Sequence, residues 1–279
     1  MTEGGRADAS RTGAPTSARA ITKDATVELR EGGALWLTLH RPAARNAMTF
    51  AMYDLLEQTA GRANEDAAVK ALVVTGAGGA FIAGTDIAQF ADFSTAEQAY
   101  AYEDRMERVL GALEAVRKPT IAAIAGATTG GGLAIAAACD LRVATAAATF
   151  GMPIARTLGN CLALANLVRI SSLIGVARTK ELVFTARIIP AEEARAFGLV
   201  NEVVADDAAL HARVDELAGL MAAHAPLTLW ATKEGLRRIR ERMLPDEAHD
   251  LVALCYTSGD FREGVRAFME KRRPQWTGK

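Results

Sequence analysis

Short apolar runs alternate with longer amphipathic stretches along most of this chain. Residues 26–30 and 34–40 have the pattern of two strands around the turn Glu31-Gly32-Gly33, which predicts a β-hairpin. Further apolar runs predict strands at 71–75, 120–125 and 141–144, and helical periodicity predicts helices at 50–63, 96–116 and 130–139. Strands that alternate with helices in this way indicate βαβ units, so the expected fold class is α/β with a parallel sheet.

The two ends of the chain differ from this middle part. Residues 1–22 are small and polar, with too few apolar side chains to offset the entropy of ordering, and are expected to form a disordered tail. From residue 162 onward the pattern predicts helices at 162–174, 177–184, 191–197, 207–223, 226–241, 246–256 and 260–272, with a last strand at 199–204. We therefore expect three parts: the tail (1–22), an α/β core (23–205) and a helical C-terminal region (206–279).

Composition narrows the classes of partner. The 279 residues include 32 Lys and Arg against 33 Asp and Glu, a formal net charge of −1, which argues against a nucleic-acid partner. No apolar run approaches the roughly 20 residues of a membrane span, so no membrane partner is expected. The three cysteines, Cys139, Cys161 and Cys255, fit no metal-ligand spacing and are too few for a disulfide framework. We therefore expect no metal site and a reducing, cytoplasmic location.

Three glycine-bearing segments follow predicted strands and carry the candidate chemistry. They are FIAGTDI at 81–87, AGATTGGGL at 125–133 and FGMP at 150–153. A helix that begins in glycines exposes unpaired amide N–H groups, and two such groups directed at one point make an oxyanion hole. The structural alternatives are a tight strand-to-helix turn at GGG and a helix cap at Asp86. The segments at 81–87 and 125–133 match neither a Walker A loop nor the GxGxxG spacing of a dinucleotide site.

Together with HRPAARNAM at 40–48 and DFREGVRAFMEKRRPQW near the C-terminus, these segments resemble the crotonase superfamily, that of enoyl-CoA hydratase and isomerase. The resemblance runs from about residue 25 to the end of the chain. It implies a spiral of βαβ turns that carries the CoA site, here the core 23–205. It also implies a helical C-terminal part, here 206–279, that builds homotrimers, often paired into homohexamers. The implied substrate is an acyl-CoA thioester of fatty-acid or related metabolism, with no separate cofactor.

The resemblance also assigns residues to the site. The shared chemistry of that family is stabilisation of a thioester enolate by two backbone N–H groups, which on this chain would be those of Thr85 and Gly131. The family's C-terminal segment, which in relatives approaches the CoA of a neighbouring subunit, matches Phe268 and Lys271. Positions that match CoA or substrate contacts are Arg45, Ala47, Ala83, Asp86, Ile87, Phe268 and Lys271.

Two positions depart from the family pattern. Family hydratases carry one glutamate three residues after the middle glycine of GGG and another directly after the FGxP proline; here these residues are Ala134 and Ile154. Syn hydration of an enoyl thioester needs two acid–base groups, so standard hydration is doubtful. The oxyanion hole would instead serve another enolate reaction, such as isomerisation, decarboxylation or thioester hydrolysis. The alternative is a non-catalytic acyl-CoA-binding or structural homologue.

Polar residues after Ile154 are further candidates for the acyl pocket, each with a structural alternative. Arg156 is either an ion-pair partner or a clamp on a carboxylate or phosphate. Asn160 is either a helix cap or a substrate contact, and Cys161 either a buried small side chain or a nucleophile. On the helix at 96–116, one acid could replace the missing base, but solvent exposure is the expectation for Glu103, Asp104 and Glu107. The basic cluster at 237–242 is also expected to face solvent.

Overall fold

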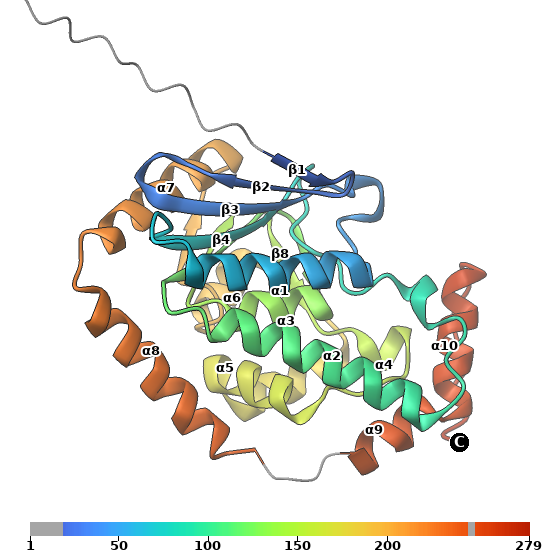
Figure 1. Cartoon of the computed structure of the whole chain (residues 1–279). Coiled ribbons are helices and arrows are strands. Elements are labelled where there is room, and N and C mark those ends of the chain that lie inside the picture. Colours follow the sequence, from blue (N-terminus) through green and yellow to red (C-terminus); the bar gives the residue numbers. More distant parts are fainter. Residues whose placement is uncertain (1–18, 245–248) are drawn as a thin grey trace, which may run out of the picture.

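The computed structural model describes residues 19–244 and 249–279, which form two β-sheets wrapped by helices (Figure 1). The strands of the large sheet, in spatial order, are β1 (Arg19–Thr22), β2 (Ala25–Leu29), β3 (Ala34–Leu39), β4 (Ala71–Gly76), β5 (Thr120–Ile124), β7 (Leu141–Thr145) and β10 (Glu202–Val204). From β3 to β10 all pairs are parallel, as the βαβ pattern predicted. A small sheet holds β6 (Ala127–Thr129), β8 (Thr149–Gly151) and β9 (Ile188–Pro190).

The N-terminal hairpin is confirmed and is one strand longer than the sequence indicated. β2 pairs antiparallel with β3, and the intervening turn uses Gly32 and Gly33 at φ of 82° and 88°, a region that favours glycine. Order was expected to begin near residue 25, but β1 pairs antiparallel with β2. Backbone pairing to an exposed strand edge needs little apolar side-chain surface, so composition missed it. The rest of the expected tail lies outside the described residues.

Both faces of the large sheet are buried, which explains why its strands are continuous apolar runs. One face contributes Leu35, Leu37 and their neighbours to the main core, together with α1 (Phe50–Glu65), α2 (Ala96–Glu114), α3 (Gly131–Ala138) and α5 (Leu164–Thr185). The opposite face, including Trp36, packs on α7 (Asp207–Ala222). The helical region expected from residue 206 therefore begins with a helix that belongs to the core.

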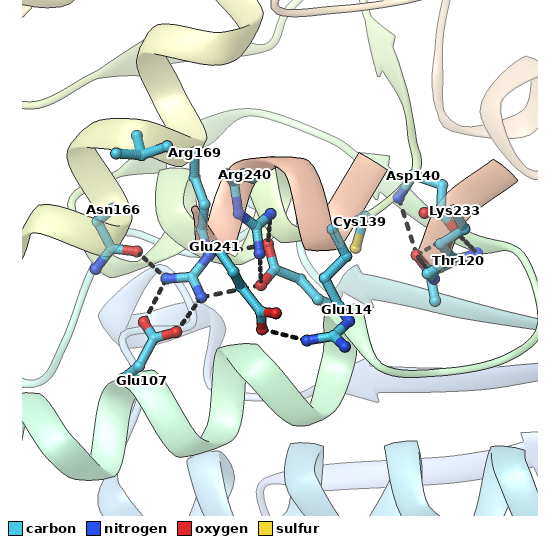
Figure 2. A network of polar contacts seen from close by, with 12 residues as sticks. Glu107, Glu114, Thr120, Cys139, Asp140, Asn166, Arg169, Lys233, Arg240 and Glu241 are labelled. Atoms are coloured by element: carbon cyan, nitrogen blue, oxygen red, sulfur yellow. Dashed lines mark hydrogen bonds and ion pairs between the residues drawn. The ribbon is translucent and has the colours of Figure 1, made fainter. Parts of the chain in front are cut away.

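The remaining C-terminal helices attach to the body in two ways. α8 (Pro226–Glu241) has no buried residue, and Figure 2 shows polar contacts that connect it to the body. Arg240 pairs with the buried carboxylate of Glu114 on α2, and Lys233 Nζ lies 2.7 Å from an Asp140 carboxylate oxygen. The basic cluster at 237–242 was expected to face solvent throughout; this was wrong for Arg240, because Glu114 is buried within its reach.

In contrast, α9 (His249–Tyr256) and α10 (Gly259–Met269) share an apolar cluster with the chain's own α2, the short α4 (Ile154–Thr157) and the 3₁₀ turn η3 (Ile87–Phe90). Phe90, Leu158, Tyr256 and Phe261 are its large buried members. The first residues of the helix predicted at 246–256 lie outside the described residues. Within the described ranges, no helix combines the length and apolarity that a bilayer crossing requires.

Candidate active site

A cavity of about 750 Å³ lies where α9 and α10 fold over the mouth of the α/β core. It is lined by thirteen of the fourteen residues that the sequence singled out: Arg45, Ala47, Ala83, Thr85, Asp86, Ile87, Gly131, Ala134, Ile154, Arg156, Asn160, Cys161 and Phe268. Lys271 is the exception, since it lies beyond the end of α10 and away from the cavity wall. Phe268 matches a segment that in relatives approaches the CoA of a neighbouring subunit, and here it lines the cavity of its own chain.

The Thr85 and Gly131 amides lie together on one wall. The backbone on either side of Thr85 is held by hydrogen bonds from Met48 N to Gly84 O and from Asp86 N to Met48 O, both 2.9 Å. Gly131 is the first residue of α3, where an N–H group has no acceptor within the helix. Neither amide has a hydrogen-bond acceptor among the described residues. Two unpaired donors therefore line the cavity.

Glycine is required at residue 131 by close packing. A Cβ atom there would lie 2.5 Å from the Tyr53 hydroxyl, 3.2 Å from Thr85 Oγ1 and 3.6 Å from Thr85 N. These distances place the start of α3 directly against the Thr85 backbone. The missing side chain leaves the Gly131 amide next to that of Thr85, so one ligand atom can approach both.

A chain of three hydroxyls supports this wall from behind. Thr85 Oγ1 shares hydrogen bonds with the hydroxyls of Tyr53, at 2.8 Å, and Tyr102, at 2.9 Å. Burial raises the pKa of Tyr53 to about 12 and the pKa of Tyr102 well above its ordinary value, so both phenols stay neutral at physiological pH. Sequence reasoning missed both tyrosines, because each has the helical spacing of an ordinary core position.

Glu103 was expected to face solvent, and this was wrong. Its carboxyl lines the cavity, and the Tyr256 hydroxyl of α9 donates a hydrogen bond of 2.5 Å to Glu103 Oε1. Burial raises the pKa of Glu103 to about 7, helped by the charges of Glu107 and Asp104 and opposed by the Tyr256 hydrogen bond. The cause is the fold of α9 over α2, which covers this carboxyl.

The other two candidate acids on this helix stay outside the cavity. Asp104 is exposed, as expected. Glu107 is half exposed and pairs with the buried guanidinium of Arg169 on α5, which also binds Glu114 (Figure 2). Of the three candidates for a substitute base, only Glu103 therefore faces the place where a ligand would lie.

The three polar candidates after Ile154 lie in different surroundings. Arg156 is exposed at the cavity, and its side chain has no ion-pair partner among the described residues. Asn160 does not cap α5, whose N-cap is Ala163; its Nδ2 donates to the Tyr256 hydroxyl at 3.2 Å. Asn160 Oδ1 is buried and finds no donor within the described residues. Burial raises the pKa of the Cys161 thiol, which disfavours a nucleophilic thiolate.

The remaining candidates are structural or inert. Asp86 caps η3 by accepting a hydrogen bond from Ala88 N at 3.2 Å and pairs with Arg41 at 2.9 Å. Ala134 and Ile154 line the cavity with groups that cannot transfer a proton. None of the four histidines lines it. No cluster of His, Cys, Asp and Glu suited to a metal ion occurs in the described part of the chain.

Comparison with known proteins places this cavity in a family. The family model for enoyl-CoA hydratase/isomerase matches residues 30–279. A crotonyl-CoA hydratase from Syntrophomonas wolfei is 35% identical over 248 residues, which cover 87% of this chain and 94% of the relative. A 2,3-dehydroadipyl-CoA hydratase from Escherichia coli is 34% identical over 253 residues, which cover 90% of this chain and 97% of the relative.

Solved structures agree with this assignment. Methylmalonyl-CoA decarboxylase in complex with 2-nitronate-propionyl-CoA has a TM-score of 0.83 and 25% identity, with 92% of this chain and 99% of that chain covered. An enoyl-CoA hydratase/carnitine racemase from Magnetospirillum magneticum has a TM-score of 0.74 and 34% identity, and the match covers 92% of this chain and 97% of that chain. The chain belongs to the enoyl-CoA hydratase/isomerase family of acyl-CoA enzymes, and its α/β architecture is the crotonase fold.

Proposed function

We propose that this chain binds an acyl-CoA thioester in the cavity and stabilises its enolate with the N–H groups of Thr85 and Gly131. The observation that carries the proposal is the pair of unpaired amides on one cavity wall. Hydrogen-bond donors that already surround the position of the developing oxyanion lower the reaction barrier, because they need no reorganisation during the reaction. No cofactor besides the coenzyme A of the substrate enters the scheme.

The CoA moiety would lie along Arg45, Ala47 and Ala83, beside Asp86 and Ile87, with Phe268 closing over it. Arg45 is exposed at the cavity and has no ion-pair partner among the described residues, so its guanidinium is available to a phosphate. Lys271 lies outside this cavity, and a contact from it would need a second subunit.

The reaction we propose is an enolate reaction other than standard hydration. Ala134 and Ile154 match the positions at which family hydratases carry their two glutamates, and neither side chain moves a proton. Each missing acid–base group is worth about 10²–10⁴-fold in rate. Isomerisation, decarboxylation and thioester hydrolysis all use the same oxyanion hole. The second candidate, a non-catalytic acyl-CoA binder, is favoured by the apolar wall at these two residues.

We also propose a homotrimer or homohexamer as the working assembly, in the cytoplasm. The exposed apolar side chains of α8 and α9 support an assembly, among them Leu227, Leu236, Ile239 and Leu254, which are 63–70% exposed in the single chain. Unpaired Cys139, Cys161 and Cys255 support a reducing compartment.

The test combines binding with proton exchange. Calorimetry with butyryl-CoA measures binding, and mass spectrometry in D₂O measures deuterium entry at the thioester α-carbon. In Gly131→Pro, one donor is lost, and exchange should fall by about 10²–10³-fold. A Cβ at residue 131 also meets the Tyr53 hydroxyl, so Gly131→Ala, which adds that Cβ but keeps the N–H, is the matched control. Circular dichroism checks the folding of both variants.

Three outcomes separate the candidates. Exchange that is lost in Gly131→Pro and kept in Gly131→Ala supports the oxyanion hole. Binding without exchange leaves the non-catalytic binder. Crotonyl-CoA hydration at ordinary enzyme rates, followed by loss of the enoyl-thioester absorbance, would contradict the proposal that hydration is not the reaction.

A further inference from the structure

We propose that Glu103 is the catalytic acid–base residue of this site: it removes a proton from the α-carbon of the bound thioester and returns it, a task for which Ala134 and Ile154 are unfit. This inference rests on the proposed function and adds the group that moves the proton. It assigns that role to α2, whose other acids, Glu97, Asp104, Glu107 and Glu114, do not line the cavity.

Elimination within the cavity leads to Glu103. Two carboxyl groups line it, those of Asp86 and Glu103. Asp86 is committed to Arg41 and to the cap of η3, so its two carboxylate oxygens already have partners. Glu103 has no cationic partner among the described residues and is held by a single donor. It is therefore the carboxyl whose protonation state can change at low cost.

The hydrogen bonding of Glu103 leaves one oxygen available. Tyr256 donates to Oε1, and the Tyr256 oxygen in turn accepts from Asn160 Nδ2. Oε2 accepts no hydrogen bond within the described residues. A carboxyl that is held through one oxygen and lines the cavity can exchange a proton with a ligand through the other oxygen.

Electrostatics keep this carboxyl ready to exchange protons near neutral pH. Burial raises its pKa to about 7, where a group is both deprotonated often enough to act as a base and acidic enough to return the proton. The titratable groups that act on it or feel its charge come from its own helix, from α1 and α9, and from the segment before α5: Tyr53, Tyr102, Asp104, Glu107, Cys161 and Tyr256. Arg169 forms an ion pair with Glu107, whereas Glu103 has no cationic partner among the described residues.

One carboxylate is sufficient for a 1,3-proton shift. Glu103 takes a proton from the α-carbon of a 3-enoyl thioester, and the C–H electron pair moves into the carbonyl, giving an enolate held by the Thr85 and Gly131 amides. The resulting carboxylic acid then gives the proton to the γ-carbon, which yields the 2-enoyl thioester and restores the carboxylate. No water and no second acid–base group take part. Double-bond isomerisation therefore fits a site with a single mobile carboxyl better than hydration.

The experiment follows conversion of 3-butenoyl-CoA to crotonyl-CoA by the growth of conjugated-thioester absorbance, with butyryl-CoA binding measured in parallel. Glu103→Gln should lower kcat at least about 10²-fold and leave binding within twofold. Asp104→Asn, at the exposed next residue, is the matched control. It removes a charge that helps to raise the pKa of Glu103, so it should leave binding unchanged and leave kcat unchanged at pH values above the midpoint. In the parent protein, kcat should rise with pH through a midpoint near 7, and Glu103→Gln should abolish that rise.

Tyr256→Phe provides a variant that keeps the carboxylate. The Tyr256 hydrogen bond lowers the pKa of Glu103, so its loss should move the midpoint of the kcat profile to higher pH. A merely structural role for Tyr256 would leave that midpoint unchanged. This variant also tests the proposal if Glu103→Gln does not fold.

The failures are distinguishable. Equal kcat in parent and Glu103→Gln, or a pH midpoint that survives the substitution, overturns the role of Glu103. A parent protein that binds butyryl-CoA but moves no proton on 3-butenoyl-CoA overturns it too, while acyl-CoA binding stands. A parent that does not bind butyryl-CoA overturns the proposed function itself.

Discussion

The two walls of the cavity are built on different principles. The wall of Thr85 and Gly131 presents backbone amides, and its side chains only support it from behind. A second wall, with Glu103, Tyr256 and Asn160, presents side chains from α2, α9 and the segment before α5. The first wall depends on where the backbone lies, because every residue except proline carries an amide N–H, and its side chains matter only where packing leaves no room for a Cβ. The second is lost when a single side chain changes, so the choice of reaction resides there.

Breaking the backbone wall should have the largest effect, and Gly132→Ala does so most directly. A Cβ at this residue would lie 2.0 Å from the carbonyl oxygen of Ile82, a backbone atom that cannot rotate away. We expect a loss of about 3 kcal/mol in the free energy of unfolding, measured by urea denaturation. Gly61→Ala, in the interior of α1 with open space around its Cβ, should instead stabilise by about 0.5–1 kcal/mol. A mild Gly132→Ala variant would contradict the close packing of α3 on Ile82.

Removing the charge of Glu103 from the side-chain wall should have the next largest effect on the free energy of unfolding, and it should stabilise the protein. Folding raises the pKa of Glu103 from its ordinary 4.5 to about 7. A carboxyl whose pKa is higher in the folded protein than in the unfolded chain lowers the stability of the fold when it ionises. The parent protein therefore loses stability as the pH rises from about 4.5 through 7, and the loss is complete above that range. The free energy of unfolding of Glu103→Gln should therefore exceed that of the parent by about 3 kcal/mol at pH 8 and differ little from it at pH 4. Urea denaturation at the two pH values, with Asp104→Asn beside it, measures the difference; equal gains at both values would be inconsistent with a raised pKa.

The smallest effect should come from the hydroxyl of Thr85. Thr85→Val leaves the amide in place and removes a bond partner from the buried phenols of Tyr53 and Tyr102, at a cost of about 1–2 kcal/mol in unfolding free energy. Deuterium exchange at the thioester α-carbon should fall less than tenfold, because the donor is the backbone. Thr85→Ser keeps the hydroxyl and is the control. A loss of exchange as large as in Gly131→Pro would show that the side chain, and not only the amide, takes part.

The same distinction explains what the sequence could predict. The strands and the helices up to α3 depend on local pattern, so the hairpin and the parallel sheet were accessible. Thr85 and Gly131, which line one cavity, were named only through the resemblance to the crotonase superfamily. The bond between Glu103 and Tyr256 joins residues 153 positions apart, and that between Glu114 and Arg240 spans 126. A charged residue in a helix carries no local mark of whether a later helix will cover it.

Because α9 and α10 cover the cavity of the chain that carries them, Thr85, Gly131 and Glu103 of one chain line a single cavity. In a mixed assembly, a subunit defective at Thr85 and another defective at Glu103 would not complement one another. An intact subunit beside them would keep its own oxyanion hole and its own acid–base residue.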